Sequence, residues 1–300
     1  MITLGANQYG KAEVRLVHVN RDGDRHEIRD LNVSVTLAGD LAATHLTGDN
    51  AAVLPTDSQK NTVYAFAREH GVAAPEEFAM LLARHFVDAG PTIHRARVGI
   101  EEYAWDRIPA TGHSFVRGGR EVRTTRVTHS ATGTHIVSGL RDMTVLNTTG
   151  SEFWGFAKDA YTTLPETRDR VLATTVHAEW RHRAREIGRG GVAGETPPAT
   201  KDWDASYACV RGALLDAFAD THSRSLQQTL YAMGGRALSA YGEEICEIRL
   251  SLPNKHHIAV DLAPFGLDNP NEVFHAADRP YGLIEGTVRH DDAEPAEEAW

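Results

Sequence analysis

Hydrophobic and polar residues alternate strictly from residue 31 to residue 37. Because successive side chains of a strand point to opposite faces, this period predicts a strand with one buried face. Residues 12–19 also have a strand-like composition, and residues 20–24 between the two segments are typical of a turn. The pattern therefore predicts a β-hairpin near the start of the chain. The apolar positions of its second strand are Leu31, Val33, Val35 and Leu37.

Two helices are predicted after the hairpin. The first covers residues 57–70 and is opened by Thr56-Asp57-Ser58, whose side chains are all good N-caps. The second begins at Pro75, carries two acids in its first turn, and is ended by Gly90-Pro91. The positions that it is predicted to bury recur at helical spacing and are Phe78, Leu81, Leu82, His85 and Phe86.

The same order of elements recurs along the rest of the chain. A Ser225 to Gln228 capping box marks the start of the last helix, and a loop rich in Gly and Pro covers residues 187–200. The predicted strands are 92–106, 113–128, 134–146, 168–183, 245–252 and 256–262, with a turn at Pro253-Asn254-Lys255 before the last, and the predicted helices are 204–221 and 225–241.

The order strand-strand, helix-helix, strand-strand therefore appears twice. It favours an α+β fold in which antiparallel sheets carry paired helices on one face. We place the domains at residues 1–140 and 141–290. The two halves share little residue identity, so the pattern alone leaves a tandem duplication open.

Composition removes several classes of function. No run of about 18 apolar residues exists, so no transmembrane helix is predicted. The first ten residues lack a basic region followed by an apolar stretch, which favours a cytoplasmic protein over a secreted one. The two cysteines, Cys209 and Cys246, are expected to be free thiols.

The net charge of −10 is partly concentrated at the end of the chain. Residues 291–300 contain five acids and no base, so this tail is predicted to be disordered. No basic stripe appears, which argues against nucleic-acid binding. A small anionic substrate would need a local cationic clamp.

Five segments carry residues suited to chemistry, and each also has a purely structural interpretation. Lys11 follows a glycine at a strand start and could be a solvated surface lysine. The helix start within residues 54–62 could bind an anion through its free N–H groups. The aromatic cluster at 150–156 could be core, or could clamp a flat anion together with Arg170. Gln227 is not explained by the cap, and the Asn and His within residues 251–257 could face one site.

Metal and cofactor signals are weak. Sixteen histidines are present, but no HExxH or similar ligand spacing stands out. His177 and His182 are five apart on a predicted strand and would face opposite sides. The glycines at 188–194 lack the Lys and Ser or Thr of a phosphate loop. We therefore expect no metal and no cofactor.

Taken together, the five segments resemble the urate oxidase (uricase) family, in a bacterial member. The resemblance runs from residue 9 to residue 256 and therefore covers nearly the whole chain. The motifs, in family order, are Y-G-K at 9–11, T-D-S-x-K-N-T at 56–62, F-W-G-F at 153–156 with Y-T-T-L at 161–164 and then Arg170, S-x-Q at 225–227, and S-L-P-N-K-H at 251–256.

The resemblance implies two tandem T-fold (tunnelling-fold) domains that assemble into a barrel-like homotetramer with active sites between subunits. It also implies that urate is oxidised by dioxygen and water to 5-hydroxyisourate and hydrogen peroxide, without a cofactor. The implied catalytic proton relay is Lys11, Thr56 and His256, and the implied substrate-binding residues are Thr56, Asp57, Phe153, Leu164, Arg170, Leu226, Gln227 and Asn254.

Two other functions are compatible with parts of the sequence. A related T-fold enzyme could act on a pterin or a similar ring, in some cases with zinc. A protein that keeps the fold only for binding would lack the lysine and the threonine, and both are present. Loss of urate absorbance with oxygen uptake in chelator-treated buffer separates these hypotheses.

Overall fold

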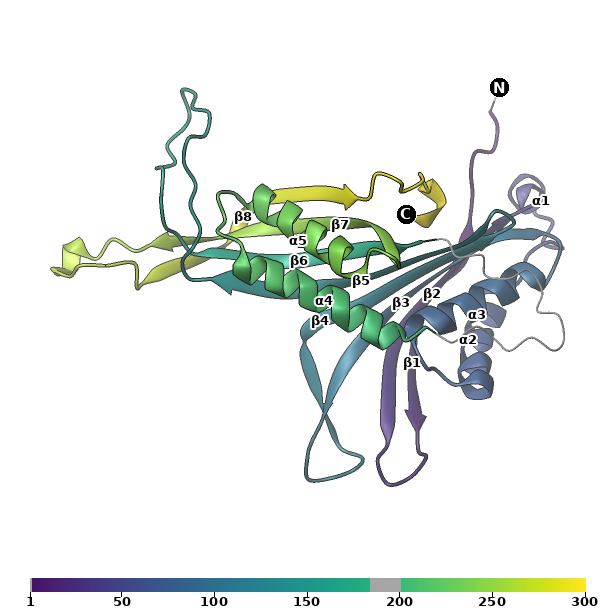
Figure 1. The fold of residues 1–300 in the computed structure, drawn as a ribbon. Helices are drawn as coiled ribbons and strands as arrows, with labels where there is room; N and C mark the ends of the chain where they lie inside the picture. The colour runs from purple at the N-terminus through teal and green to yellow at the C-terminus, as the bar shows by residue number, and fades with distance from the viewer. Residues whose placement is uncertain (1, 184–200) are drawn as a thin grey trace. The chain divides into compact units, whose positions relative to one another are not determined.

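The computed structural model of the chain describes residues 2–183 and 201–300 (Figure 1). Within these residues the strands form a sheet whose hydrogen-bonded order is that of the chain, from β1 to β8. The strands are β1 Tyr9–Asn20, β2 Glu27–Gly39, β3 Ile93–Arg107, β4 Phe115–Ser130, β5 Gly133–Asn147, β6 Leu172–His182, β7 Ile245–Ala259 and β8 Phe274–Arg289. The helices are α1 Ala42–Leu46, α2 Thr56–His70, α3 Pro75–Asp88, α4 Trp203–Asp220 and α5 Leu226–Tyr241, with 3-10 turns at η1 Ala263–Phe265 and η2 Glu297–Ala299.

The chain divides into two compact units. The first contains the described residues of 1–139, 180–205 and 294–300, and the second contains 140–179 and 206–293. The main division therefore falls near residue 140, and two later segments belong with the first unit. The α+β class expected from the order of elements is confirmed.

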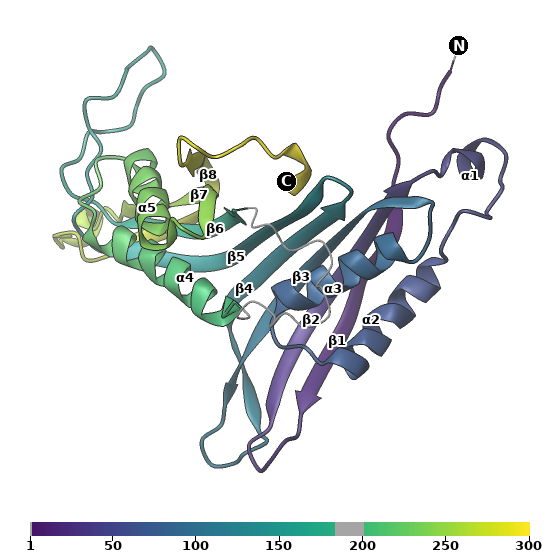
Figure 2. The same ribbon diagram turned by 45° about the vertical axis from the view of Figure 1, so that its right-hand side comes forward.

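In the first unit, β1 to β4 pair antiparallel in sequence. Helix α3 packs on β3 and β4, and α2 packs on β1 (Figure 2). The strict alternation in β2 has the predicted result, because Leu31, Val33, Val35 and Leu37 are at most 2% exposed. These side chains lie in one hydrophobic core with those of α3.

Helix α3 begins at Pro75 as predicted and buries Phe78, Leu82 and Phe86. Leu81 and His85, both predicted to be buried, are only half-buried. The fully buried positions Ala79 and Ala83 take their place on the core face. Small residues there let the helix approach the sheet closely, which a reading of large apolar residues alone does not reveal.

In the second unit, β7 and β8 pair antiparallel and α5 packs on both strands. Helices α4 and α5 lie on the same face of these strands (Figure 1). The Ser225 cap is confirmed, since its side chain accepts a hydrogen bond from the Gln228 N–H at 3.2 Å. The Gln228 side chain, however, accepts from the N–H of Arg224 at 2.8 Å and not from that of Ser225. Neither Cys209 nor Cys246 forms a disulfide within the described residues, as expected.

The predicted turn at Pro253-Asn254-Lys255 is wrong. Residues 245–259 form the single strand β7, whose pairing with β8 shifts register between Asn254 and His256. A β-bulge here inserts an unpaired residue without ending the strand. Proline is tolerated at such an irregular position, although it suggests a turn in sequence. The strand β8 at 274–289 and the short helix α1 were not predicted.

The acidic tail is ordered where it was predicted to be disordered. Residues 297–299 form a 3-10 turn in which Ala299 is 1% exposed. The carbonyl of Glu298 accepts a hydrogen bond from Arg97 at 3.1 Å, and that of Glu294 accepts one from Arg181 at 2.8 Å. Arginines of the first unit thus bind the tail through its backbone, which its side-chain composition could not show.

The predicted loop at 187–200 lies outside the described residues. Among the helices of the described residues, none combines the length and the apolar character needed to cross a membrane.

Candidate functional site

The first group of predicted site residues lies where β1 begins beside α2. The Tyr9 hydroxyl donates to the Leu54 carbonyl at 3.1 Å and accepts from the Leu54 N–H at 3.0 Å. Burial raises the pKa of the Tyr9 hydroxyl, with the Leu54 hydrogen bond acting in the opposite direction. This double contact ties the Y-G-K motif to the segment that leads into α2. Lys11, two residues further along β1, is half-buried.

A β-bulge follows Lys11. The pairing of β1 with β2 shifts register between Lys11 and Val14, and Glu13 has a left-handed backbone with φ of 57°. The Glu13 N–H donates to the Ser34 hydroxyl at 3.0 Å. Bulges re-aim neighbouring side chains and are frequent beside active sites. The irregularity therefore sets the direction of the strand at the predicted catalytic lysine.

Thr56 and Asp57 occupy the first turn of α2. Pro55 takes the N-cap position and no side chain caps the helix, so the predicted capping by residues 56–58 is wrong. Asp57 is bonded within the helix, to Lys60 at 2.5 Å and to Asn61 at 3.0 Å. The Lys60 hydrogen bond and charge lower the pKa of the Asp57 carboxyl, and Lys11 adds a smaller contribution in the same direction. Lys11 and Asp57 therefore share one electrostatic environment.

The second group is built around a loop closed at its base. The backbones of Phe153 and Thr167 exchange two hydrogen bonds of 2.9 Å, which close the loop between them. The guanidinium carbon of Arg170 lies 5.3 Å from the centroid of the Phe153 ring. The Phe156 ring stacks on the Phe153 ring, with ring centroids 4.9 Å apart and an interplanar angle of 14°. An aromatic face and a planar cation are thus brought together.

Arg170 carries a partly desolvated charge. Burial lowers the pKa of its guanidinium, and no neighbouring acid counteracts that effect. Within residues 2–183 and 201–300 no carboxylate forms an ion pair with it. Its only side-chain hydrogen bond in that part of the chain is from Nε to the Ser151 hydroxyl, at 3.1 Å. Removing water from a cation without supplying a counter-charge is costly unless an anion binds there.

Leu226 and Gln227 begin α5 beside this pair. Ser151 and Ser223 form a parallel bridge, so the chain before Arg170 and the chain before α5 are hydrogen-bonded to each other. Leu226 is 2% exposed and faces the core, whereas Gln227 is exposed. The Gln227 amide has no hydrogen-bond partner in the described part of the chain. Figure 1 shows α5 starting at the end of the unit from which the loop before β6 extends.

Asn254 and His256 lie on β7 on either side of its bulge. Asn254 pairs with Gly282 and His256 with Ala277. Asn254 is half-buried and His256 exposed. The side chain of the next histidine, His257, is instead bonded to the Lys255 carbonyl at 3.1 Å. His256 is therefore the more exposed of the two adjacent histidines.

The predicted site residues belong to different parts of the fold. Lys11, Thr56 and Asp57 lie in the first unit, and the others lie in the second. Leu164, predicted to wall the pocket, is 57% exposed on the loop between Phe153 and Thr167. The sequence had assigned no role to Tyr9, Ser151 or Ser223, because their contacts join segments that are distant along the chain.

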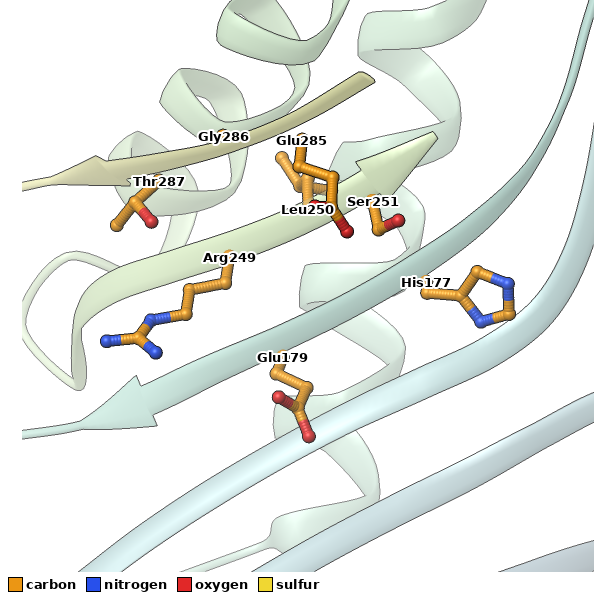
Figure 3. Close-up of a pocket in the computed structure, with 8 residues that line it drawn as sticks. All are labelled: His177, Glu179, Arg249, Leu250, Ser251, Glu285, Gly286 and Thr287. Atoms are coloured by element: carbon orange, nitrogen blue, oxygen red, sulfur yellow. The ribbon is translucent and has the colours of Figure 1, made fainter. Parts of the chain in front are cut away.

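A separate pocket of about 320 Å³ lies on the sheet of the second unit. Figure 3 shows the lining side chains, which come from β6, β7 and β8. It contains none of the predicted site residues. Its lining is His177, Glu179, Arg249, Leu250, Ser251, Glu285, Gly286 and Thr287.

In the described residues, no three His, Cys, Asp or Glu side chains come close enough together to hold a metal ion. The group formed by Arg170 and its neighbours instead combines a guanidinium, aromatic rings and a hydroxyl. Such a set suits a flat anion with several hydrogen-bonding edges.

Comparison with known proteins gives a consistent result. The family model described as Uricase matches residues 7–128 and 136–285. The uricase of Arthrobacter globiformis is 52% identical over 299 residues, which cover 100% of this chain and 94% of that protein. The uricase of Emericella nidulans is 38% identical, and the match covers 96% of this chain and 97% of the relative.

Solved structures agree. The crystal structure of the uricase from Arthrobacter globiformis superposes with a TM-score of 0.91 at 52% identity, covering 99% of this chain and 98% of that one. A uricase from Bacillus fastidious superposes with a TM-score of 0.78 at 23% identity, covering 96% and 94% of the two chains. The second match shows the common fold alone.

Proposed function

Because the chain belongs to the uricase family, we propose that its urate oxidase activity runs through a proton relay of Lys11, Thr56 and His256 and needs no cofactor. The fold is that of the family, with two tandem T-fold domains. Urate gives two electrons to dioxygen, which leaves as hydrogen peroxide, and water supplies the hydroxyl of 5-hydroxyisourate.

The observation that carries the assignment of the binding site is the environment of Arg170. Its guanidinium is partly desolvated, lies beside the Phe153 ring, and has no acidic partner in the described residues. A flat purine anion supplies what is missing there: a negative charge for the guanidinium and a ring face for the phenylalanine. Gln227 donates and accepts at another edge of the same ring.

The remaining residues take roles consistent with their chemistry. Lys11 removes a proton from urate, which makes the ring easier to oxidise, and Thr56 and His256 pass protons onward. Asn254 holds dioxygen or water above the ring. Leu226 and Leu164 wall the pocket, and Asp57 lies beside the bound purine.

We also propose that the active unit is a homotetramer with sites between subunits, in which Thr56 and Asp57 come from one subunit and Phe153 and Arg170 from its neighbour. The exposure of Leu164 supports this, because an apolar side chain at a pocket wall is expected to be covered in the assembled protein. A cytoplasmic location stays a prediction from the sequence.

The relay is tested by substituting its first two members. We expect Lys11→Met and Thr56→Ala each to lower kcat by about 100-fold or more, since general acid-base catalysis contributes on the order of 10²–10⁴-fold. KM for urate should change little, because neither residue is the anion clamp. The measurement is the loss of urate absorbance together with oxygen uptake, in chelator-treated buffer.

Lys158→Met is a matched control, since Lys158 is an exposed lysine paired with Glu166 at 3.0 Å. It should leave kcat unchanged. Near-normal turnover in Lys11→Met or Thr56→Ala would remove the relay, and loss of wild-type activity on chelation would show that a metal is required.

A further inference from the structure

Ser151 is a fully buried residue with no role in the chemistry above. Its exposed fraction is 0%, so its hydroxyl is cut off from water and must find its partners within the protein. The partner that it has is Arg170: the Arg170 Nε donates to the Ser151 Oγ at 3.1 Å. The Arg170 backbone N–H also donates to the Ser151 carbonyl, at 2.9 Å. Arg170 is therefore held by the same residue at both its backbone and its side chain.

Ser151 is itself fixed by the start of α5. The N–H of Glu152 donates to the Ser223 carbonyl at 2.8 Å, and the N–H of Ser223 donates to the Gly150 carbonyl at 2.9 Å. Ser223, also 0% exposed, donates its hydroxyl to the Ser225 carbonyl at 3.1 Å and accepts from the Thr229 hydroxyl at 2.8 Å. A shift of Ser151 relative to α5 would break several of these bonds together.

The bond to Nε decides which edge of the guanidinium is available. An arginine can bind a planar anion through Nε and one Nη, or through both Nη groups. Because Nε is bonded to Ser151, the edge with the two Nη groups is the one left free, and neither has a partner in the described residues. The ring carbonyl and nitrogen atoms of a purine anion offer two adjacent acceptors in one plane, which match that edge.

We infer that Ser151 is a positioning residue for urate binding, which fixes the Arg170 guanidinium so that its two Nη groups engage the purine anion together. The inference rests on the proposed role of Arg170. It adds that the affinity of the site depends on a buried hydroxyl that does not touch the substrate.

The test is Ser151→Ala, which removes the hydroxyl and keeps the backbone bonds. We expect KM for urate to rise about tenfold, the scale of a lost hydrogen bond to a charged group, with kcat within about twofold of wild type. The dissociation constant of xanthine, measured by titration calorimetry, should rise by the same factor. A raised KM with an unchanged kcat indicates that the lost interaction binds the ground state and the transition state equally.

Ser206→Ala is the matched control. Ser206 is a buried serine of the same unit, 2% exposed, and its hydroxyl has no hydrogen-bond partner among the described residues. It should leave KM and xanthine affinity at the wild-type values. If Ser206→Ala raised them as much as Ser151→Ala does, the effect would reflect the loss of any buried hydroxyl, and the inference would be wrong.

A double-mutant cycle separates positioning from a general loss of structure. In the Arg170→Ala background, Ser151→Ala should add no further loss of xanthine affinity, because the group that it positions is gone. Additive losses, or an unchanged xanthine affinity in Ser151→Ala alone, would overturn the inference. If Arg170→Ala lowered the affinity for xanthine and Ser151→Ala left it unchanged, the inference would be overturned, but the proposed role of Arg170 as the anion clamp would stand.

Discussion

At the scale of single residues, Gly10 shows why the Y-G-K motif needs its glycine. A Cβ built on Gly10 would lie 1.8 Å from the Val35 carbonyl oxygen and 2.8 Å from the carbonyl carbon. Both atoms are backbone, so no side-chain rotation relieves the overlap. Glycine therefore lets β1 lie close against β2 between Tyr9, which binds Leu54, and the predicted catalytic Lys11.

We predict that Gly10→Ala destabilises the fold by about 1–3 kcal/mol, the usual cost of overpacking, or more because the overlap is with backbone. The reason is that β1 must move away from β2 to admit the methyl group. Thermal unfolding followed by calorimetry measures the effect. Gly119→Ala, on β4, is the control, because nothing lies within 4 Å of its added Cβ. Equal melting temperatures for the two variants would contradict the prediction.

At the scale of secondary-structure elements, a buried polar network joins α3, β4, β5 and β6 in the first unit. The Ser138 hydroxyl donates to Glu76 at 2.7 Å and lies 2.9 Å from Nε2 of His182. Lys201 Nζ lies 3.0 Å from the other ring nitrogen, Nδ1. Because the ammonium can only donate, Nδ1 accepts and the proton of the neutral ring is on Nε2. Arg123 binds the other oxygen of Glu76 at 2.8 Å.

The two titratable groups of this network respond to pH in opposite ways. Burial raises the pKa of Glu76, with Arg123 partly offsetting it. Burial, followed by the charges of Lys201 and Arg123, lowers the pKa of His182 well below 6.5. Below about pH 6.5 the unfolded chain takes up a proton at this histidine and the folded chain does not, so stability falls on acidification. Protonation of Glu76 acts against that loss at lower pH.

We therefore predict that His182→Gln reduces the acid sensitivity of the fold. Glutamine keeps a donor for Ser138 but cannot be protonated, so the fall in melting temperature between pH 7.5 and pH 5.5 should shrink by about 2–4 °C, equivalent to roughly 1 kcal/mol. His177→Gln, a half-buried position on the same strand, is the control and should retain the wild-type slope. A wild-type slope in His182→Gln would show that other groups cause the acid loss.

At the scale of the whole molecule, the predicted site residues are divided between the two compact units. Thr56 belongs to the first unit and Arg170 to the second. The proposed homotetramer brings them together from neighbouring subunits. If so, an intact site can form between two chains that each carry a different defective residue.

We predict that co-expressed Thr56→Ala and Arg170→Ala chains recover activity when they assemble together. If the two residues of a site come from different subunits, about a quarter of the sites in an equal mixture carry both wild-type residues. Activity at low urate should then approach about a quarter of the wild-type value. Activity no higher than that of the two parents assembled separately would place both residues of a site in one chain.

Much of the fold could be predicted from the sequence, because the information is local. The alternation at 31–37 and the cap at Ser225 depend on strand geometry and on one helical turn. The motifs around Lys11, Thr56, Arg170 and Asn254 give the family, since the chemistry of the reaction limits which residues stand there. Their separate roles in this chain stay predictions.

Tertiary structure alone decided the features that depend on contacts between distant segments. Residues 253–255 continue β7 because β8 supplies hydrogen-bond partners across the bulge, and the acidic tail is ordered because Arg97 and Arg181 bind its backbone. The partial burial of Arg170 and its bond to Ser151 likewise depend on contacts between residues that are distant along the chain. The sequence by itself determined which residue types are present for the chemistry, and packing decided which of their atoms are left free to perform it.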